Sequence, residues 1–168
     1  TGRPWFGLTV ATPGRVLLAL GEEDLDEMRR RIFGVAYHMR LTHDERRLAV
    51  ERLTLAPLSG VTLALLERDP AGNVCESPAL HDLRRVLDAA DDWSLVALDP
   101  LSRWAGIDAE TDNALATRFV SSLETLTKAK GSPTVLVAHH TSKQSRKDGD
   151  KSAGSARGSS ALVDGARW

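Results

Sequence analysis

Three short apolar runs in this chain each lead into polar residues that could do chemistry. These are Glu23-Asp24 after residues 15–20, Asp99 at the end of residues 94–99, and His139-His140 after residues 134–138. A carboxylate can hold Mg²⁺ or polarise an attacking water, and an imidazole can donate a hydrogen bond to a phosphate. Ligands of parallel α/β sheets bind at the carboxyl ends of the strands. The three ends therefore predict one nucleotide or metal site.

Each of these residues also has a structural alternative. Asp99-Pro100 can end a strand and begin a turn, as Asp and Pro commonly do. Asp24 is a natural N-cap, and acidic residues favour helix N-termini, so for Asp24 both readings stay open. His140 can be an ordinary strand-end histidine. For Glu23 the position favours a role in activating water.

A basic segment follows the histidines. Residues 141–158 contain no aliphatic side chain larger than alanine and carry five basic against two acidic residues, a net charge of +3. This composition predicts a mobile loop. It suits contact with the phosphates of a nucleic acid, although a solvated linker is the alternative. The candidate contact residues are Lys143, Arg146, Lys147, Lys151 and Arg157.

The periodicity of the apolar residues predicts an α/β fold. Helical spacing predicts helices over about 24–38, 42–53, 77–90 and 112–130, the second opened by a capping box at Thr42. We expect a further strand over 61–66 and a loop over 100–112. The order strand, helix, strand with short joints indicates βαβ units and a mostly parallel sheet flanked by helices. We expect one domain over residues 1–168.

The bulk composition is that of a globular protein. The chain has 168 residues, 42% hydrophobic and 27% charged, and a net charge of −1. This charge gives no general attraction to nucleic acid or membranes. Cys75 is the only cysteine, which excludes an internal disulfide framework. We expect a reducing, cytoplasmic setting.

One motif is missing. No G-x-x-x-x-G-K-[S/T] phosphate-binding loop occurs in the 168 residues. The chain also starts without Met, and its last residues lie inside a continuing pattern. We therefore expect a piece of a longer protein whose phosphate-binding loop lies upstream of Thr1.

The order of these motifs, together with the tail Arg157–Trp168, resembles the RepA-type replicative helicases. These are RecA-like hexameric ATPases of plasmids and phages, also grouped with the AAA family. The resemblance extends over about residues 1–168. It implies a RecA-like P-loop NTPase core, ATP and Mg²⁺ as cofactors, and single-stranded DNA as the partner of a homo-oligomeric, hexameric ring.

The resemblance also implies roles for single residues. Glu23 is similar to the glutamate that activates water, with Asp24 beside it, and Asp99 to the Walker B aspartate on Mg²⁺. His140 is similar to the histidine that senses the γ-phosphate. Arg167 matches the arginine that reaches a neighbouring subunit's nucleotide, and the basic loop matches the DNA-contacting loop of the ring channel.

Two other functions stay open at this stage. A metal-dependent phosphoesterase could use Glu23, Asp99 and His140 as direct ligands without a phosphate-binding loop. A non-catalytic module could use the basic loop to bind nucleic acid or another partner.

Overall fold

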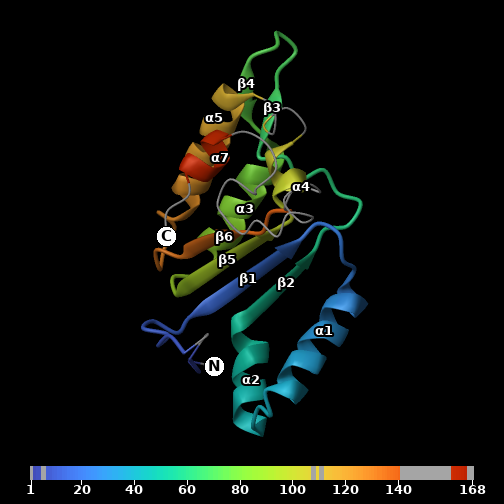
Figure 1. Cartoon of the computed structure of the whole chain (residues 1–168), viewed down its shortest axis with the longest axis vertical. Coiled ribbons are helices and arrows are strands. Elements are labelled where there is room, and N and C mark those ends of the chain that lie inside the picture. Colours follow the sequence, from blue (N-terminus) through green and yellow to red (C-terminus); the bar gives the residue numbers. More distant parts are fainter. Residues whose placement is uncertain (1, 5–6, 107–108, 110–111, 141–159, 166–168) are drawn as a thin grey trace, which may run out of the picture.

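A four-stranded parallel sheet forms the centre of the protein (Figure 1). The computed structural model describes residues 2–4, 7–106, 109, 112–140 and 160–165. The strands lie in the order β2-β1-β5-β6, and every neighbouring pair is parallel. This confirms the predicted α/β class with a parallel sheet. The strand bounds are β1 Arg15–Leu20, β2 Leu53–Pro57, β5 Trp93–Asp99 and β6 Thr134–Val137.

Helices flank this sheet. Figure 1 shows α1 and α2 near β2, whereas α5 and α7 lie side by side in another part of the molecule. Their bounds are α1 Leu25–His38, α2 His43–Arg52, α3 Pro78–Asp88, α4 Leu101–Ala105, α5 Asn113–Leu126 and α7 Ser160–Asp164. A separate antiparallel hairpin joins β3 Leu66–Arg68 to β4 Val74–Glu76. None of the helices in the described residues is both long and apolar enough to cross a membrane.

Polar caps fix where three of the helices begin. The Asp24 carboxylate accepts a hydrogen bond from Glu27 N at the start of α1, and Ser77 caps α3 in the same way. At α2, Thr42 and Glu45 form the predicted capping box, in which each side chain accepts from the other residue's backbone N–H. The sequence signals for these starts are therefore confirmed.

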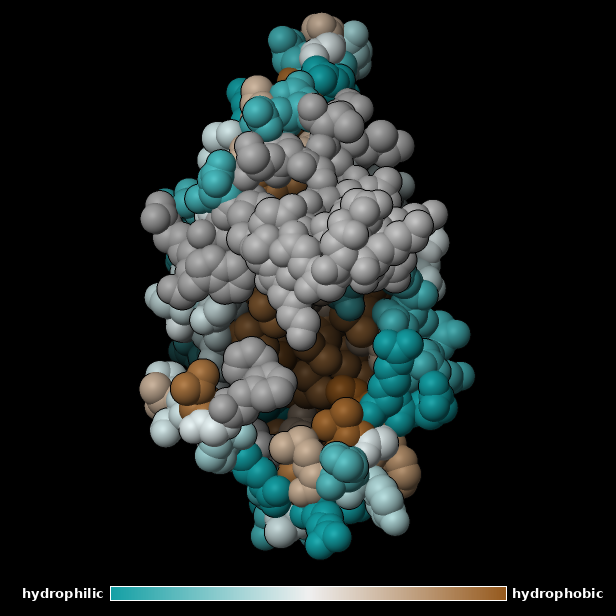
Figure 2. Space-filling model, in the orientation of Figure 1, coloured by the Kyte–Doolittle hydropathy of each residue, from teal (hydrophilic) through white to brown (hydrophobic). Residues whose placement is uncertain are grey.

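The two faces of the sheet differ in burial. Leu17 and Val96 point to the face covered by α3 and α5 and are 2% and 0% exposed. Their neighbours Val16, Leu18 and Leu95 point to the other face and are only half-buried. Figure 2 shows an apolar hollow over β1 and β2 on this second face. The main core therefore lies on one side of the sheet.

Two local predictions were wrong. Residues 61–65 are a loop and β3 begins only at Leu66, although Leu65 in this loop is fully buried in the core. The edge strand of the sheet is instead β2, which begins directly after α2. Within the expected loop after Asp99, residues Leu101–Ala105 form α4.

Gly131 offers a test of how tightly β6 is joined to β5. Its φ is +88°, and an added Cβ would lie 2.5 Å from Trp93 O. Gly60 has a similar φ of +79°, but a Cβ there would meet nothing within 4 Å. We expect Gly60→Ala to cost about 1 kcal/mol through the left-handed backbone alone. Gly131→Ala should cost about 3 kcal/mol because the backbone clash is added.

Urea unfolding measures the free energy of unfolding of both variants, and the comparison holds if their m-values are equal. Equal losses in Gly131→Ala and Gly60→Ala would contradict the close approach of the turn before β6 to the start of β5.

Candidate functional site

The ends of β1, β5 and β6 are joined by backbone hydrogen bonds. Gly21 N donates to Asp99 O at 2.7 Å, which joins the end of β1 to the end of β5. Ala138 N donates to Leu98 O at 3.0 Å, and Leu101 N donates to Ala138 O at 2.7 Å. The three predicted strand ends therefore lie next to one another at one edge of the sheet.

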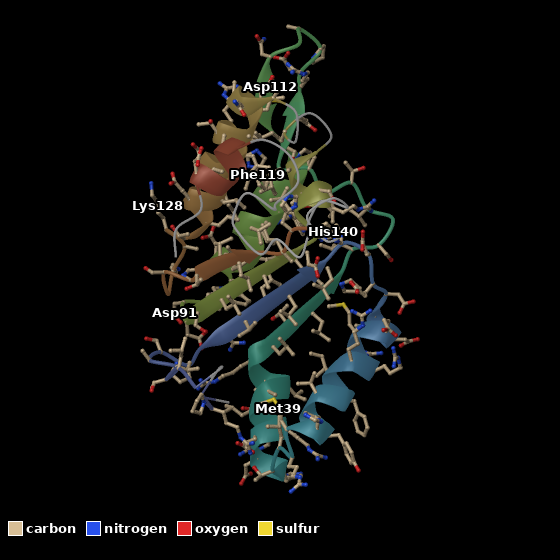
Figure 3. The ribbon with its side chains drawn as sticks, viewed as in Figure 1. Met39, Asp91, Asp112, Phe119, Lys128 and His140 are labelled. Carbon is tan, nitrogen blue, oxygen red and sulfur yellow. The ribbon has the colours of Figure 1, made fainter. Side chains whose placement is uncertain are left out.

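Asp99 lies at the middle of this edge. It is the last residue of β5, it is half-buried, and it pairs in register with Leu20 at the end of β1. Figure 3 shows Asp91 near the opposite end of the same strand. Asp99 is thus the only one of the two carboxylates placed where a ligand at the carboxyl edge could meet it.

The Glu23 carboxylate lies in the short connection from β1 to α1. Its side chain is only 16% exposed, and its Oε1 forms an ion pair with Arg31 Nη1 at 2.8 Å. Arg31 belongs to α1 and is 58% exposed. The sequence signals a contact of Arg31 with Glu27, four residues earlier in the helix, but it does not signal the contact with Glu23.

Asp24 has the structural role that its position allowed. Its Oδ1 accepts the hydrogen bond from Glu27 N at 2.8 Å, and its side chain is exposed. The carboxylate thereby caps α1. A catalytic role of Asp24 beside this structural one stays a prediction.

Glu27 joins two arginines on the surface of α1. Arg30 contacts it through two hydrogen bonds of 2.8 and 2.7 Å, and Arg31 Nε donates to its Oε1 at 2.7 Å. These donors, those of Arg30 first, lower the pKa of Glu27 from its ordinary 4.5 to about 2. Glu27 therefore stays ionised and keeps Arg31 directed along α1.

The two histidines differ in exposure. His139 is half-buried, whereas His140 is exposed, as expected for neighbouring residues at a strand end. Figure 3 shows His140 at the edge where β1 and β5 end. His140 is therefore the histidine that a ligand at this edge can reach.

Arg103 on α4 also reaches this edge, and it is not among the predicted site residues. A Cβ on Gly21 would lie 3.2 Å from Arg103 Cγ and 2.9 Å from Leu63 Cδ1. Glycine at position 21 thus allows Arg103 to pack directly over the end of β1. Its Nη2 donates to Val61 O at 3.4 Å, and its side chain is exposed. The signal available in the sequence was its position four residues after Asp99.

The other predicted site residues lie outside the described part of the chain. They are Lys143, Arg146, Lys147, Lys151, Arg157 and Arg167. Their roles as DNA contacts or as an intersubunit arginine stay predictions.

The described residues contain no group of three His, Cys, Asp or Glu side chains that could hold a metal ion. Glu23, Asp99 and His140 are all described, and they do not form such a group. A single carboxylate such as Asp99 fits Mg²⁺, because Mg²⁺ keeps several waters and shares phosphate oxygens. A cavity of about 660 Å³ lies beside α4. Arg103 lines it, whereas Glu23, Asp99 and His140 are not among its described lining residues.

The lowered pKa of Glu27 can be measured by following its side-chain carboxyl carbon by NMR. We expect a midpoint at about pH 2. Because the folded pKa is below the ordinary 4.5, the contribution of Glu27 to stability is present above pH 4.5. It is lost as the pH falls toward 2.

Arg30→Gln should raise the midpoint of Glu27 toward 4.5, because the hydrogen bonds from Arg30 are the largest cause of the shift. Arg29→Gln is the matched control, since Arg29 pairs with Asp26 instead. A midpoint near 4.5 in the unsubstituted protein would contradict the ion-pair cluster on α1.

Comparison with known proteins agrees with this geometry. A family model described as an AAA domain matches residues 1–146. No curated protein gives a significant match. The expected AAA-type ATPase domain is confirmed, whereas the narrower likeness to RepA-type helicases stays a prediction. The chain belongs to the AAA domain family of P-loop ATPases.

Proposed function

We propose that the protein hydrolyses ATP and couples hydrolysis to movement along single-stranded DNA, as in RepA-type replicative helicases. The observation that carries the proposal is that the ends of β1, β5 and β6 lie side by side at one edge of a parallel sheet, and that Glu23, Asp99 and His140 lie at or just after these ends. Family membership supports the ATPase part. The DNA part rests on the basic loop and on the resemblance.

The chemical step needs a water and a general base. In our proposal the water oxygen attacks the γ-phosphorus, and the Glu23 carboxylate accepts one of its protons. The bond from the γ-phosphorus to the β–γ bridging oxygen breaks, which leaves ADP and inorganic phosphate. The low exposure of Glu23, 16%, supports this role because it limits competing hydrogen bonds from bulk water.

Asp99 would hold the metal at this site. Mg²⁺ bound there supplies positive charge to the phosphate oxygens as negative charge develops on them. Asp99 is suited to this because its strand is paired on both sides, which fixes its backbone. The 168 residues contain no Walker A sequence, so the proposal also needs a phosphate-binding loop from elsewhere in the protein.

Coupling to DNA would pass through His140. It is exposed at the same edge and directly precedes residues 141–158. A change in the hydrogen bond between His140 and the γ-phosphate would act first on this basic loop, because the loop follows His140 directly in the chain. In a homo-oligomeric ring, which we propose is a hexamer, Arg167 would reach the nucleotide of the next subunit.

Asp99→Asn tests the metal-binding role in the full-length protein with Mg²⁺ and ATP. We expect kcat to fall by about a hundredfold or more, because the amide cannot replace the negative charge that holds the metal. Asp91→Asn is the matched control, as it makes the same change near the other end of β5.

Asp91→Asn should leave the ATPase rate within about twofold of that of the unsubstituted protein, because Asp91 lies away from the carboxyl edge of the sheet. Undiminished turnover of the Asp99→Asn protein would contradict the proposal that Asp99 is the Walker B aspartate.

Replacing the five basic residues of the loop by Gln, at constant loop length, tests the DNA contact. We expect DNA-stimulated ATPase to fall more than basal ATPase, and the salt dependence of DNA affinity to weaken. Deleting residues 143–151 should act in the same direction.

Equal loss of basal and stimulated rates would argue against a DNA-contacting loop. Unchanged DNA binding that does not depend on nucleotide would favour the non-catalytic module instead.

A further inference from the structure

We infer that Arg31 is the positioning residue for the Glu23 carboxylate, acting through a relay of contacts along α1. The inference rests on the proposed function, because it assigns a role to a residue that acts on the proposed general base. Nothing in the family match names this residue.

The first step is the contact itself. Arg31 Nη1 lies 2.8 Å from Glu23 Oε1. The ion pair is made by Oε1, which is one of the two oxygens of this carboxylate. One oxygen is therefore held by a cation while the other can accept a proton from water. This division suits a general base that must keep one orientation.

The second step is that Arg31 is itself held in place. Its Nε donates to Glu27 Oε1 at 2.7 Å, one helical turn earlier. The backbone N–H of Glu27 is in turn fixed by the Asp24 cap at 2.8 Å. The N-terminus of α1 thus sets the direction of Arg31, and Arg31 sets the direction of Glu23.

The third step is that the pairing of the sheet does not extend to Glu23. Gly21 is tied to Asp99 by a backbone hydrogen bond, but Glu23 lies two residues further along, outside the sheet and before the first residue of α1. The sheet therefore fixes the Glu23 backbone only loosely. The side chain needs a separate anchor, and Arg31 is the cation that supplies it.

The test compares three substitutions in the full-length protein under steady-state ATPase conditions. We expect Arg31→Gln to lower kcat by roughly tenfold with the KM for ATP unchanged, because a misplaced base weakens the chemical step alone. Arg31→Lys should recover part of this loss, since it restores one charged contact. Arg29→Gln is the matched control on the same helix, and its pairing with Asp26 does not involve Glu23.

The inference is overturned if Arg31→Gln behaves like Arg29→Gln, or if it raises KM without lowering kcat. If Glu27 acts only through Arg31, the double variant Glu27→Gln, Arg31→Gln should have the same kcat as Arg31→Gln. A much lower kcat of the double variant would contradict the relay through Glu27. Glu23→Gln in the same series separates the two proposals. Full activity of Glu23→Gln overturns the proposed base itself, whereas an inactive Glu23→Gln beside a fully active Arg31→Gln overturns only the positioning role.

Discussion

The backbone hydrogen bond from Gly21 N to Asp99 O, 2.7 Å long, joins the ends of β1 and β5, and the site is built around it. Parallel strands run in the same direction, so in-register pairing through their evenly spaced hydrogen bonds brings their carboxyl ends to one edge. Leu20 pairs with Asp99 and Leu98 with Val137, which places Asp99 at the last paired position of β5 and the other two polar segments just beyond the paired residues. If β1 slipped by one residue, its buried side chains would turn to the other face of the sheet. Packing of Leu17 and Ala19 in the core therefore also fixes the site.

The sequence predicted the elements whose signals are local. The caps at Asp24, Thr42 and Ser77 depend on neighbouring residues only, and all three helices begin where predicted. Polar residues after apolar runs predicted that Glu23, Asp99 and His140 would share one edge. That prediction needed only the parallel order of the strands, which short βαβ connections favour.

The failures came from contacts between distant parts of the chain. Residues 61–66 are apolar enough for a strand, but Leu65 N donates to Trp104 O at 2.8 Å and its side chain fills the core from a loop. The short helix α4 has one turn and no side-chain cap, so no periodicity could reveal it. Arg31 was missed for a related reason. Its spacing from Glu27 was visible, but Glu23 lies outside the helix, and only the fold brings the two side chains together.

The site thus depends on two supports of different kinds. Asp99 is fixed by the sheet, because its strand is paired on both sides and its partners lie far away in the sequence. Glu23 is held by its ion pair with Arg31 on the exposed surface of α1. Arg31 is in turn held by Glu27, whose backbone N–H donates to the Asp24 cap. Exposed ion pairs contribute little to stability and are easily exchanged. A carboxylate held this way can be directed without being locked, which suits the proposed role of Glu23 as the general base.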